Sequence, residues 1–293
     1  MPIQIDNLHP YLRDRRHSVA IGVFDGVHLG HQKVLKEAGW ALTFHPHPRE
    51  VLTGGADVTF LTTLEERQKL IPRLLVLRFN RRLANYSPER FVKEVLVDTL
   101  KVKKVFVGYD FCFGKNRSGN IQTLIVLGRK FGFEIDVIPV IKAGGVEVRS
   151  SKIRQLLTKG RVDQAAVLLG RPYRLEGQVV GGQKLGRKLG FPTANLKLHP
   201  QKCLPALGIY QAWACLGRRR YKAVVSIGLR PTVQPKSGGV VVEAYLLRFQ
   251  RSIYGQNLAL EFLKHLRPER RFGSLKQLVR QMQRDVKKAW GSS

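Results

Sequence analysis

The sequence predicts a Rossmann-like α/β domain followed by a small all-β barrel of the Greek-key type and a C-terminal helix. In the first half of the chain, apolar strands alternate with helical stretches, which is the pattern of a parallel sheet. Beyond residue 170, short β runs follow one another between Gly and Pro turns, which favours a barrel. A chain of 293 residues, 43% of them hydrophobic, is long enough for two cores. We therefore expect two domains, 1–168 and 171–293, with the boundary near Gly170.

Five apolar runs predict the strands of the first domain. They are residues 18–24, 40–44, 73–79, 103–111 and 133–140. Two sequence signals predict helix starts between these strands. Thr63 and Glu66 have the spacing of a capping box, and Ser87 precedes a proline and a glutamate. Between His31 and the strand that begins near Trp40 there is room for only about two helical turns, so the helix after the first strand must be short.

The second domain is predicted from five further β runs and one helix. The runs are residues 173–182, 208–217, 221–229, 239–249 and 257–263. The helix begins at Ser274, which has Gln277 in capping-box spacing. It carries one apolar stripe, made of Leu275, Leu278, Val279, Met282 and Val286. We expect this stripe to pack on the barrel.

Composition narrows the classes of function. The net charge is +30, and residues 171–293 hold 24 basic but only 5 acidic side chains, a balance that attracts phosphate groups. A nucleic-acid-binding protein is one alternative, but the sequence has no RNP-type aromatic pattern, zinc knuckle or arginine-rich tail.

Cys112, Cys203 and Cys215 form no CxxC pair, which fits a reducing cytoplasm. No apolar run approaches the roughly 18–20 residues of a membrane span, so we expect a soluble cytoplasmic protein that does not contact a membrane.

The segment GVFDGVHLGH, residues 22–31, joins the first predicted strand to the first helix. Its glycines allow close approach, and the helix start offers backbone N–H groups to a phosphate. His28 and His31 are three residues apart, so they share one helical face and can stabilise charge on a nucleotide. Two alternatives stay open: a tight turn with surface histidines, and a zinc site completed by His45 and His47.

The segment GGQKLGRKLGFPTANL, residues 181–196, indicates a second phosphate site. A glycine-rich turn supplies backbone donors, and Thr193 and Asn195 supply the hard oxygen ligands that Mg²⁺ prefers. The GK[ST] order of a Walker A loop is absent. A plain β-turn followed by a strand accounts for the glycines but not for the paired Thr and Asn.

Glu243 is the candidate general base. Strand alternation places it on one face with Val241 and Tyr245, so its carboxylate lies among apolar neighbours, where it needs a partner. Partial desolvation also favours the role of a general base. A buried ion pair is the alternative.

At this point the chain resembles the prokaryotic bifunctional riboflavin kinase/FAD synthetase family, which has a nucleotidyltransferase domain before a kinase domain. The first-domain motifs that carry the resemblance are GVFDGVHLGH, TFHPHPREVL, VGYDFCFGKNRSG and VRSSKIRQLL. Those of the second are GRPYRLEGQVVGGQKLGRKLGFPTANL, SIGLRPTV, VEAYLLRF and LRPERRF. The match covers nearly the whole chain in order.

For the first domain, the resemblance implies that FMN attacks the α-phosphorus of ATP, giving FAD and pyrophosphate, while His28 and His31 contact the ATP phosphates. The other matching residues would surround the nucleotide and the flavin: Gly22, Phe24, Asp25, Asp110, Ser150, Ser151 and Arg154. Arg149 replaces the first serine of the family's phosphate loop. Because of this change and the short first helix, a riboflavin kinase with an impaired first domain is a second alternative.

For the second domain, the resemblance implies phosphorylation of riboflavin to FMN. Thr193 and Asn195 would bind Mg²⁺ with ATP, Gly186 would belong to the nucleotide turn, and Glu243 would act as the base. Arg267 would hold the flavin or the nucleotide, or else belong to a solvated charge run. The expected substrates are riboflavin, FMN and ATP, with Mg²⁺ as cofactor.

Overall fold

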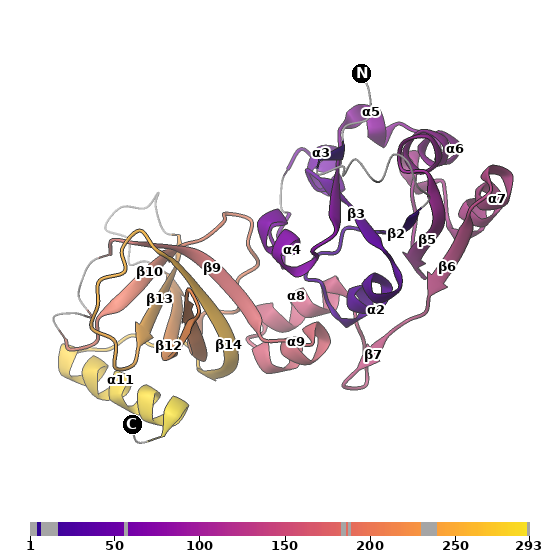
Figure 1. Ribbon diagram of the computed structural model, residues 1–293. Coiled ribbons are helices and arrows are strands. Elements are labelled where there is room, and N and C mark those ends of the chain that lie inside the picture. The colour runs from indigo at the N-terminus through magenta and orange to yellow at the C-terminus, as the bar shows by residue number, and fades with distance from the viewer. Residues whose placement is uncertain are drawn as a thin grey trace. The chain divides into compact units, whose positions relative to one another are not determined.

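The computed structural model describes residues 5–6, 17–55, 58–182, 186, 189–229 and 239–291 (Figure 1). Its contacts divide the chain into two compact units, Met1–Ser150 and Ser151–Ser293. The division falls earlier than the sequence pattern suggests, so most of the helical stretch before Gly170 groups with the second unit. The boundary between residues 168 and 171 remains a prediction.

The first unit contains a six-stranded sheet in the order β1-β4-β3-β2-β5-β6. The five strands β2 to β6 are parallel to their neighbours, and β1 joins the β4 edge antiparallel. The strands span Ile5–Asp6, His17–Ile21, Trp40–His45, Leu74–Arg78, Val102–Gly108 and Glu134–Ile138. All five predicted strands therefore form, and the prediction of a parallel α/β sheet is confirmed.

Both faces of this sheet are covered, because successive side chains of each strand enter different cores. Val19 and Ile21 of β2 join the core beneath α6, α7 and the π-helix η1, whereas Ala20 joins the core beneath α2 and α4. The helices span Leu29–Glu37 (α2), Pro48–Thr53 (α3), Leu64–Leu70 (α4), Arg81–Ala84 (α5), Pro88–Phe91 (α6), Val92–Thr99 (η1) and Ile121–Phe131 (α7). The 3₁₀ turn η2 spans Lys115–Arg117, and a small hairpin pairs β7 (Lys142–Ala143) with β8 (Val146–Glu147). The 9 residues of α2 confirm the short first helix.

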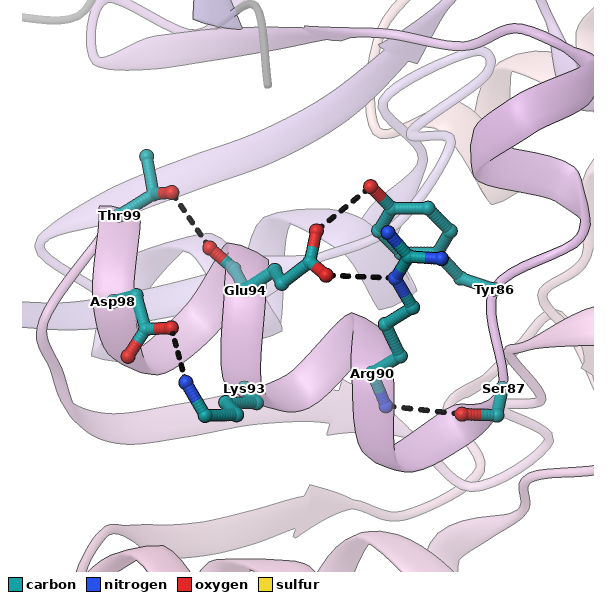
Figure 2. A network of polar contacts seen from close by, with 7 residues as sticks. All are labelled: Tyr86, Ser87, Arg90, Lys93, Glu94, Asp98 and Thr99. Carbon is teal, nitrogen blue, oxygen red and sulfur yellow. Dashed lines mark hydrogen bonds and ion pairs between the residues drawn. The ribbon is translucent and has the colours of Figure 1, made fainter. Parts of the chain in front are cut away.

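The predicted helix starts also form. Thr63 and Glu66 make a complete capping box on α4, and Ser87 caps α6. Figure 2 shows how Glu94 connects this second helix start to η1: its carboxylate accepts from the Tyr86 hydroxyl at 2.7 Å and from Nε of Arg90 at 2.7 Å. The hydroxyl of Thr99 donates to the Glu94 carbonyl at 2.6 Å across five residues, the spacing of a π-helix.

The second unit contains a closed antiparallel barrel with the strand order β10-β13-β12-β11-β14-β9. The strands span Tyr173–Val180 (β9), Thr193–Lys197 (β10), Gly208–Leu216 (β11), Arg219–Leu229 (β12), Val240–Leu246 (β13) and Asn257–Arg267 (β14). Small and branched side chains fill its interior, among them Ala194, Val225, Val242 and Ala244. Alternation therefore turns the residues between them toward the outside of the barrel. The predicted barrel is confirmed.

Three further helices are Ser150–Thr158 (α8), Val162–Leu169 (α9) and Leu275–Trp290 (α11). Helix α9 packs on β9 and β14, and α11 packs on β11, β12 and β14. Within the predicted stripe of α11, Leu275 is exposed and the other four residues are half-buried. Asp285 and Ala289 are the buried residues of this helix. Across the described ranges, no helix has the length and hydropathy that a bilayer crossing requires.

Candidate active sites

The predicted phosphate motif of the first unit forms a tight loop between β2 and α2. Its start is fixed to the neighbouring strand, since the N–H of Gly22 donates to the carbonyl of Leu42 at 3.1 Å. Phe24, Gly26 and Val27 all have positive φ, at 54°, 85° and 42°. For Phe24 and Val27 this conformation is strained, and strain of this kind clusters at binding sites.

Asp25 is buried and holds the loop in place. Its carboxylate accepts from the backbone N–H groups of Leu61 and Thr62 at 3.2 and 3.0 Å. The carbonyl of Asp25 accepts from the hydroxyl of Ser150 at 2.8 Å, although 125 residues separate the two. The structure thus brings Ser150 to the loop and shows that the Asp25 carboxylate fixes the loop to the segment of Leu61 and Thr62.

His28 and His31 lie side by side at the start of α2, as their spacing predicts. His28 is the N-cap, and its Nδ1 accepts from the backbone N–H of His31 at 3.3 Å. The two rings stack with centroids 3.6 Å apart, and the ring of Phe24 meets His31 edge-on at 5.3 Å. Cap and stack together orient both imidazoles at the positive end of the helix, where an anion is stabilised.

Sequence reasoning missed Arg67, which is 3% exposed behind this loop. Its NH1 donates to the Val23 carbonyl at 2.7 Å and to the Thr43 hydroxyl at 3.2 Å. Burial lowers the pKa of the guanidinium. The only sequence signal was an arginine four residues after the helix cap Thr63, a pattern that does not reveal a partner 44 residues away.

The remaining first-site candidates occupy other segments. Asp110 is exposed just beyond the end of β5. Ser151 is exposed and Arg154 half-buried, both on α8, which the contacts count with the second unit. Their roles at the nucleotide remain predictions.

The zinc alternative gains no support. His47 caps α3 with its Nδ1, which accepts from the N–H of Arg49 at 3.0 Å, and its ring lies 5.6 Å from that of Phe60. His45 is exposed. Within the described ranges, no three His, Cys, Asp or Glu side chains are placed to hold a metal ion.

The second unit has a cleft of about 350 Å³ between the outer face of the barrel and α11. Five predicted residues line it: Gly186, Thr193, Asn195, Glu243 and Arg267. Strand register explains the meeting, since Asn195 of β10 and Ser226 of β12 both pair with Glu243 of β13. Register partners share a face, so these three side chains form a row across the barrel.

Polar contacts arrange the floor of the cleft. The hydroxyl of Thr193 donates to Oε2 of Glu243 at 3.1 Å. A side chain at Gly182 would collide with the Asn195 amide, and one at Gly186 with the Phe191 carbonyl, so these two positions require glycine. Glu243 is half-buried rather than enclosed, since the residues that fill the barrel lie on the other face of β13.

The other side of the cleft is apolar. Helix α11 and its approach supply Phe272, Leu278, Met282 and Val286, and the barrel supplies Ile209, Val224 and Tyr245. The ring of Phe191 meets Tyr245 edge-on at 5.1 Å. A ligand with a phosphate end and a flat apolar end would match both sides.

Arg267 has a defined structural partner. Its Nε donates to Oδ1 of Asp285 at 2.9 Å and its NH2 to Oδ2 at 2.7 Å, a bidentate pair that ties β14 to α11. Nε2 of Gln281 also donates to Oδ1 of Asp285, at 2.9 Å. Sequence reasoning missed Asp285, although it lies three residues after Met282 on the apolar stripe and is one of only 5 acids in the second half.

Comparisons with known proteins match both halves of the chain. The family model for FAD synthetase matches residues 12–152, and that for riboflavin kinase matches residues 169–291. The bifunctional riboflavin kinase/FMN adenylyltransferase of Listeria monocytogenes is 33% identical over 94% of this chain and 94% of its own. The protein of the same name from Pseudomonas fluorescens is 36% identical over 96% and 95%.

The chain belongs to the bifunctional riboflavin kinase/FMN adenylyltransferase family. It is an enzyme with riboflavin kinase activity in its C-terminal module and FMN adenylyltransferase activity in its N-terminal module. A crystal structure of a protein described as a macrolide-efflux protein from Streptococcus pneumoniae is 26% identical, with a TM-score of 0.85 over 96% of this chain and 95% of that one. The term macrolide efflux describes only that protein. The family assignment of this chain rests on the two domains that the family models match.

Replacing His47 with Asn should make the protein less sensitive to acid. Burial lowers the pKa of His47 from 6.5 to about 4, so the unfolded chain takes up this proton before the folded protein does. The histidine therefore reduces stability as pH falls from 6.5 towards 4. Asn keeps a cap acceptor but does not titrate. Urea unfolding at several pH values measures this effect. As pH falls from 6.5 towards 4, the free energy of unfolding should decrease less for His47→Asn than for the wild type. The control His45→Asn, at an exposed position, should follow the wild type. An equal decrease in the free energy of unfolding for His47→Asn and the wild type would contradict the lowered pKa of His47.

Replacing Asp285 with Asn should release α11. Removing one partner of a buried pair costs about 3–5 kcal/mol, because the other charge stays buried. The control Glu261→Gln weakens only pairs with the exposed Arg174 and Arg220 and should cost at most about 1 kcal/mol. Trp290 of α11 packs against Trp213, with ring centroids 4.8 Å apart, so tryptophan fluorescence reports this unfolding. A similar loss of stability in the two variants would contradict the role of the Arg267–Asp285 pair in holding α11.

Proposed function

We propose that the C-terminal cleft phosphorylates riboflavin with Glu243 as the general base. The observation that carries this proposal is the row of Asn195, Glu243 and Ser226 on the cleft floor, next to Thr193. Oε2 of Glu243 accepts from Thr193, which leaves Oε1 to take the proton of a ribityl hydroxyl. The hydroxyl oxygen then attacks the γ-phosphorus of ATP, and ADP leaves.

The same floor fits the Mg²⁺ that we propose for this site. Thr193 and Asn195 offer hard oxygen donors, and the close approach of Gly182 holds the Asn195 amide in one place. When bound, Mg²⁺ would offset the negative charge of the phosphate groups. The hydrogen bond from Thr193 to Glu243 leaves the hydroxyl lone pairs available for this purpose.

The apolar wall of the cleft supports a place for the flavin ring. Met282 and Val286 of α11 face Val224 and Tyr245 of the barrel across a space lined by both. Arg267 holds α11 through Asp285, so we propose that it acts on the flavin through the helix rather than as a phosphate ligand.

In the N-terminal module we propose that His28 and His31 stabilise charge as an FMN phosphate oxygen attacks the α-phosphorus of ATP and pyrophosphate leaves. The stacked rings at the start of α2 support this role. Such a transfer depends on positioning and electrostatics and needs no covalent nucleophile. Asp25 and Ser150 fix the loop, and we propose Gly22, Phe24, Asp110, Ser151 and Arg154 as the remaining nucleotide and flavin contacts.

Both reactions would take place in the cytoplasm, which suits three free cysteines. Incubation of the pure protein with riboflavin, ATP and Mg²⁺, followed by separation of the flavins, tests the whole proposal. Formation of FMN and then FAD supports it. FMN alone would favour the alternative of an impaired N-terminal module.

Glu243→Gln should reduce riboflavin phosphorylation by about 10²–10⁴-fold, because the amide cannot take the proton. Supplied FMN should still become FAD at the wild-type rate. The control Glu261→Gln removes a carboxylate elsewhere on the barrel and should keep both rates. Retained kinase activity in Glu243→Gln would refute the base assignment.

His28→Ala should lower FAD formation from supplied FMN by about 10²–10³-fold, the range for loss of one stabilising donor. FMN formation from riboflavin should continue. The exposed His45→Ala is the matched control and should leave FAD formation unchanged. An unaltered FAD rate in His28→Ala would remove the histidine pair from the mechanism.

A further inference from the structure

Arg149 lies between strand β8 and helix α8, directly before Ser150. Its neighbours place it beside the loop between β2 and α2. Ser150 donates to the carbonyl of Asp25 at 2.8 Å. On the other side, the carbonyl of Val148 lies 3.8 Å from where a side chain at Gly30 would begin. The backbone of Arg149 therefore runs along the segment that carries His28.

The Arg149 side chain is held by two contacts. Its guanidinium lies over the ring of Tyr109, 5.2 Å from the ring centroid, and its Nε is 2.8 Å from Oε2 of Glu147. Tyr109 follows directly after β5, so this stack joins the end of a central strand to the segment before α8. The two contacts use one face and one edge of the guanidinium.

The rest of the guanidinium is available to a ligand. The side chain of Arg149 is 44% exposed, and its terminal nitrogens have no hydrogen-bond partner in the described part of the chain. Two terminal N–H groups in a fixed plane match the oxygens of a phosphate group, and stacking on an aromatic ring pre-organises that plane. A freely moving lysine in the same place would lack this orientation.

Tyr109 is suited to the supporting role. Its hydroxyl oxygen is buried and has no hydrogen-bond partner among the described residues. Burial is the main cause that raises the pKa of this phenol, so the ring stays neutral and its face remains attractive to a cation. A buried hydroxyl without a hydrogen-bond partner costs free energy, so the Tyr109 hydroxyl does not contribute to stability.

We propose that Arg149 binds a phosphate group of the reactants in adenylyl transfer and that Tyr109 is the positioning residue that holds its guanidinium. The inference rests on the proposed function of the N-terminal module. Adenylyl transfer brings the FMN phosphate towards the ATP phosphates, all of them negative, and a cation must offset their repulsion. His28 and His31 act from the start of α2, and Arg149 acts from the segment that Ser150 anchors to the same loop.

A surface ion pair is the competing explanation. Arg149 and Glu147 are both more than 40% exposed, and such pairs contribute little to stability. If Arg149 made only a surface ion pair with Glu147, its removal would leave the KM of every substrate unchanged. The matched control is Lys93→Ala, which breaks an exposed pair of the same 2.8 Å length with Asp98 in the same unit.

The test measures KM and kcat of Arg149→Ala in both directions of adenylyl transfer. We expect KM to rise at least about tenfold for a phosphate-bearing reactant, as for loss of a hydrogen bond between charged groups. A rise for FMN assigns the attacking phosphate, and a rise for ATP and pyrophosphate assigns the leaving phosphates. Riboflavin phosphorylation by the other module and all constants of Lys93→Ala should match the wild type. Unchanged constants in Arg149→Ala would overturn the proposal.

Two further variants separate positioning from folding. Tyr109→Leu removes the ring and should raise the same KM, whereas Tyr109→Phe keeps it and should restore the wild-type value. If Arg149→Ala also impairs riboflavin phosphorylation, Tyr109→Leu decides, because it leaves Arg149 in place and removes only the ring that positions it. A higher KM for the phosphate-bearing reactant then supports the proposal, and an unchanged KM refutes it. If the wild type forms no FAD, the proposed function of the module fails, and titration with FMN and with pyrophosphate still compares the phosphate affinity of wild type and Arg149→Ala.

Discussion

Alternation along a β-strand is the constraint on which both modules depend. Successive side chains of a strand face opposite sides, so each residue that serves a site has neighbours that must serve a core. In β13, Glu243 faces the cleft while Val242 and Ala244 fill the barrel. A register shift of one residue would place the carboxylate inside the barrel and an alanine on the cleft floor. The close packing of the barrel interior therefore also protects the chemistry outside it.

Buried charges fix the loops and helices that alternation alone cannot place. Asp25, Arg67 and Asp285 are each about 3% exposed, and each is held by backbone groups or by an opposite charge. A buried charge is stable only in the geometry that satisfies it, so these side chains restrict the loop after β2 and helix α11 to one arrangement. Both elements border a proposed site.

The sequence predicted the five parallel strands, the barrel and the C-terminal helix, because strand period and turn residues are local signals. It did not predict β10, the strand that carries Thr193 and Asn195. That these two residues share a site with Glu243 was implied only by the family resemblance, because 50 residues separate Thr193 from Glu243. The sequence also placed His28 beside His31, since three residues along a helix start make neighbours. It did not reveal Arg67 or Asp285. Their partners are 44 and 18 residues away, and only the folded chain brings them together. The ion pair between Arg267 and Asp285 shows the same limit, and the role of Arg267 at a ligand remains a prediction.

The cap at the start of α2 also determines which tautomer His28 adopts. Its Nδ1 accepts the backbone N–H of His31, so in the neutral ring the proton resides on Nε2. The only lone pair of the imidazole is already engaged. In this geometry, neutral His28 cannot remove a proton from a reactant. The FMN phosphate is already an anion and needs no base, so the role that we propose for His28 does not require its Nδ1 lone pair.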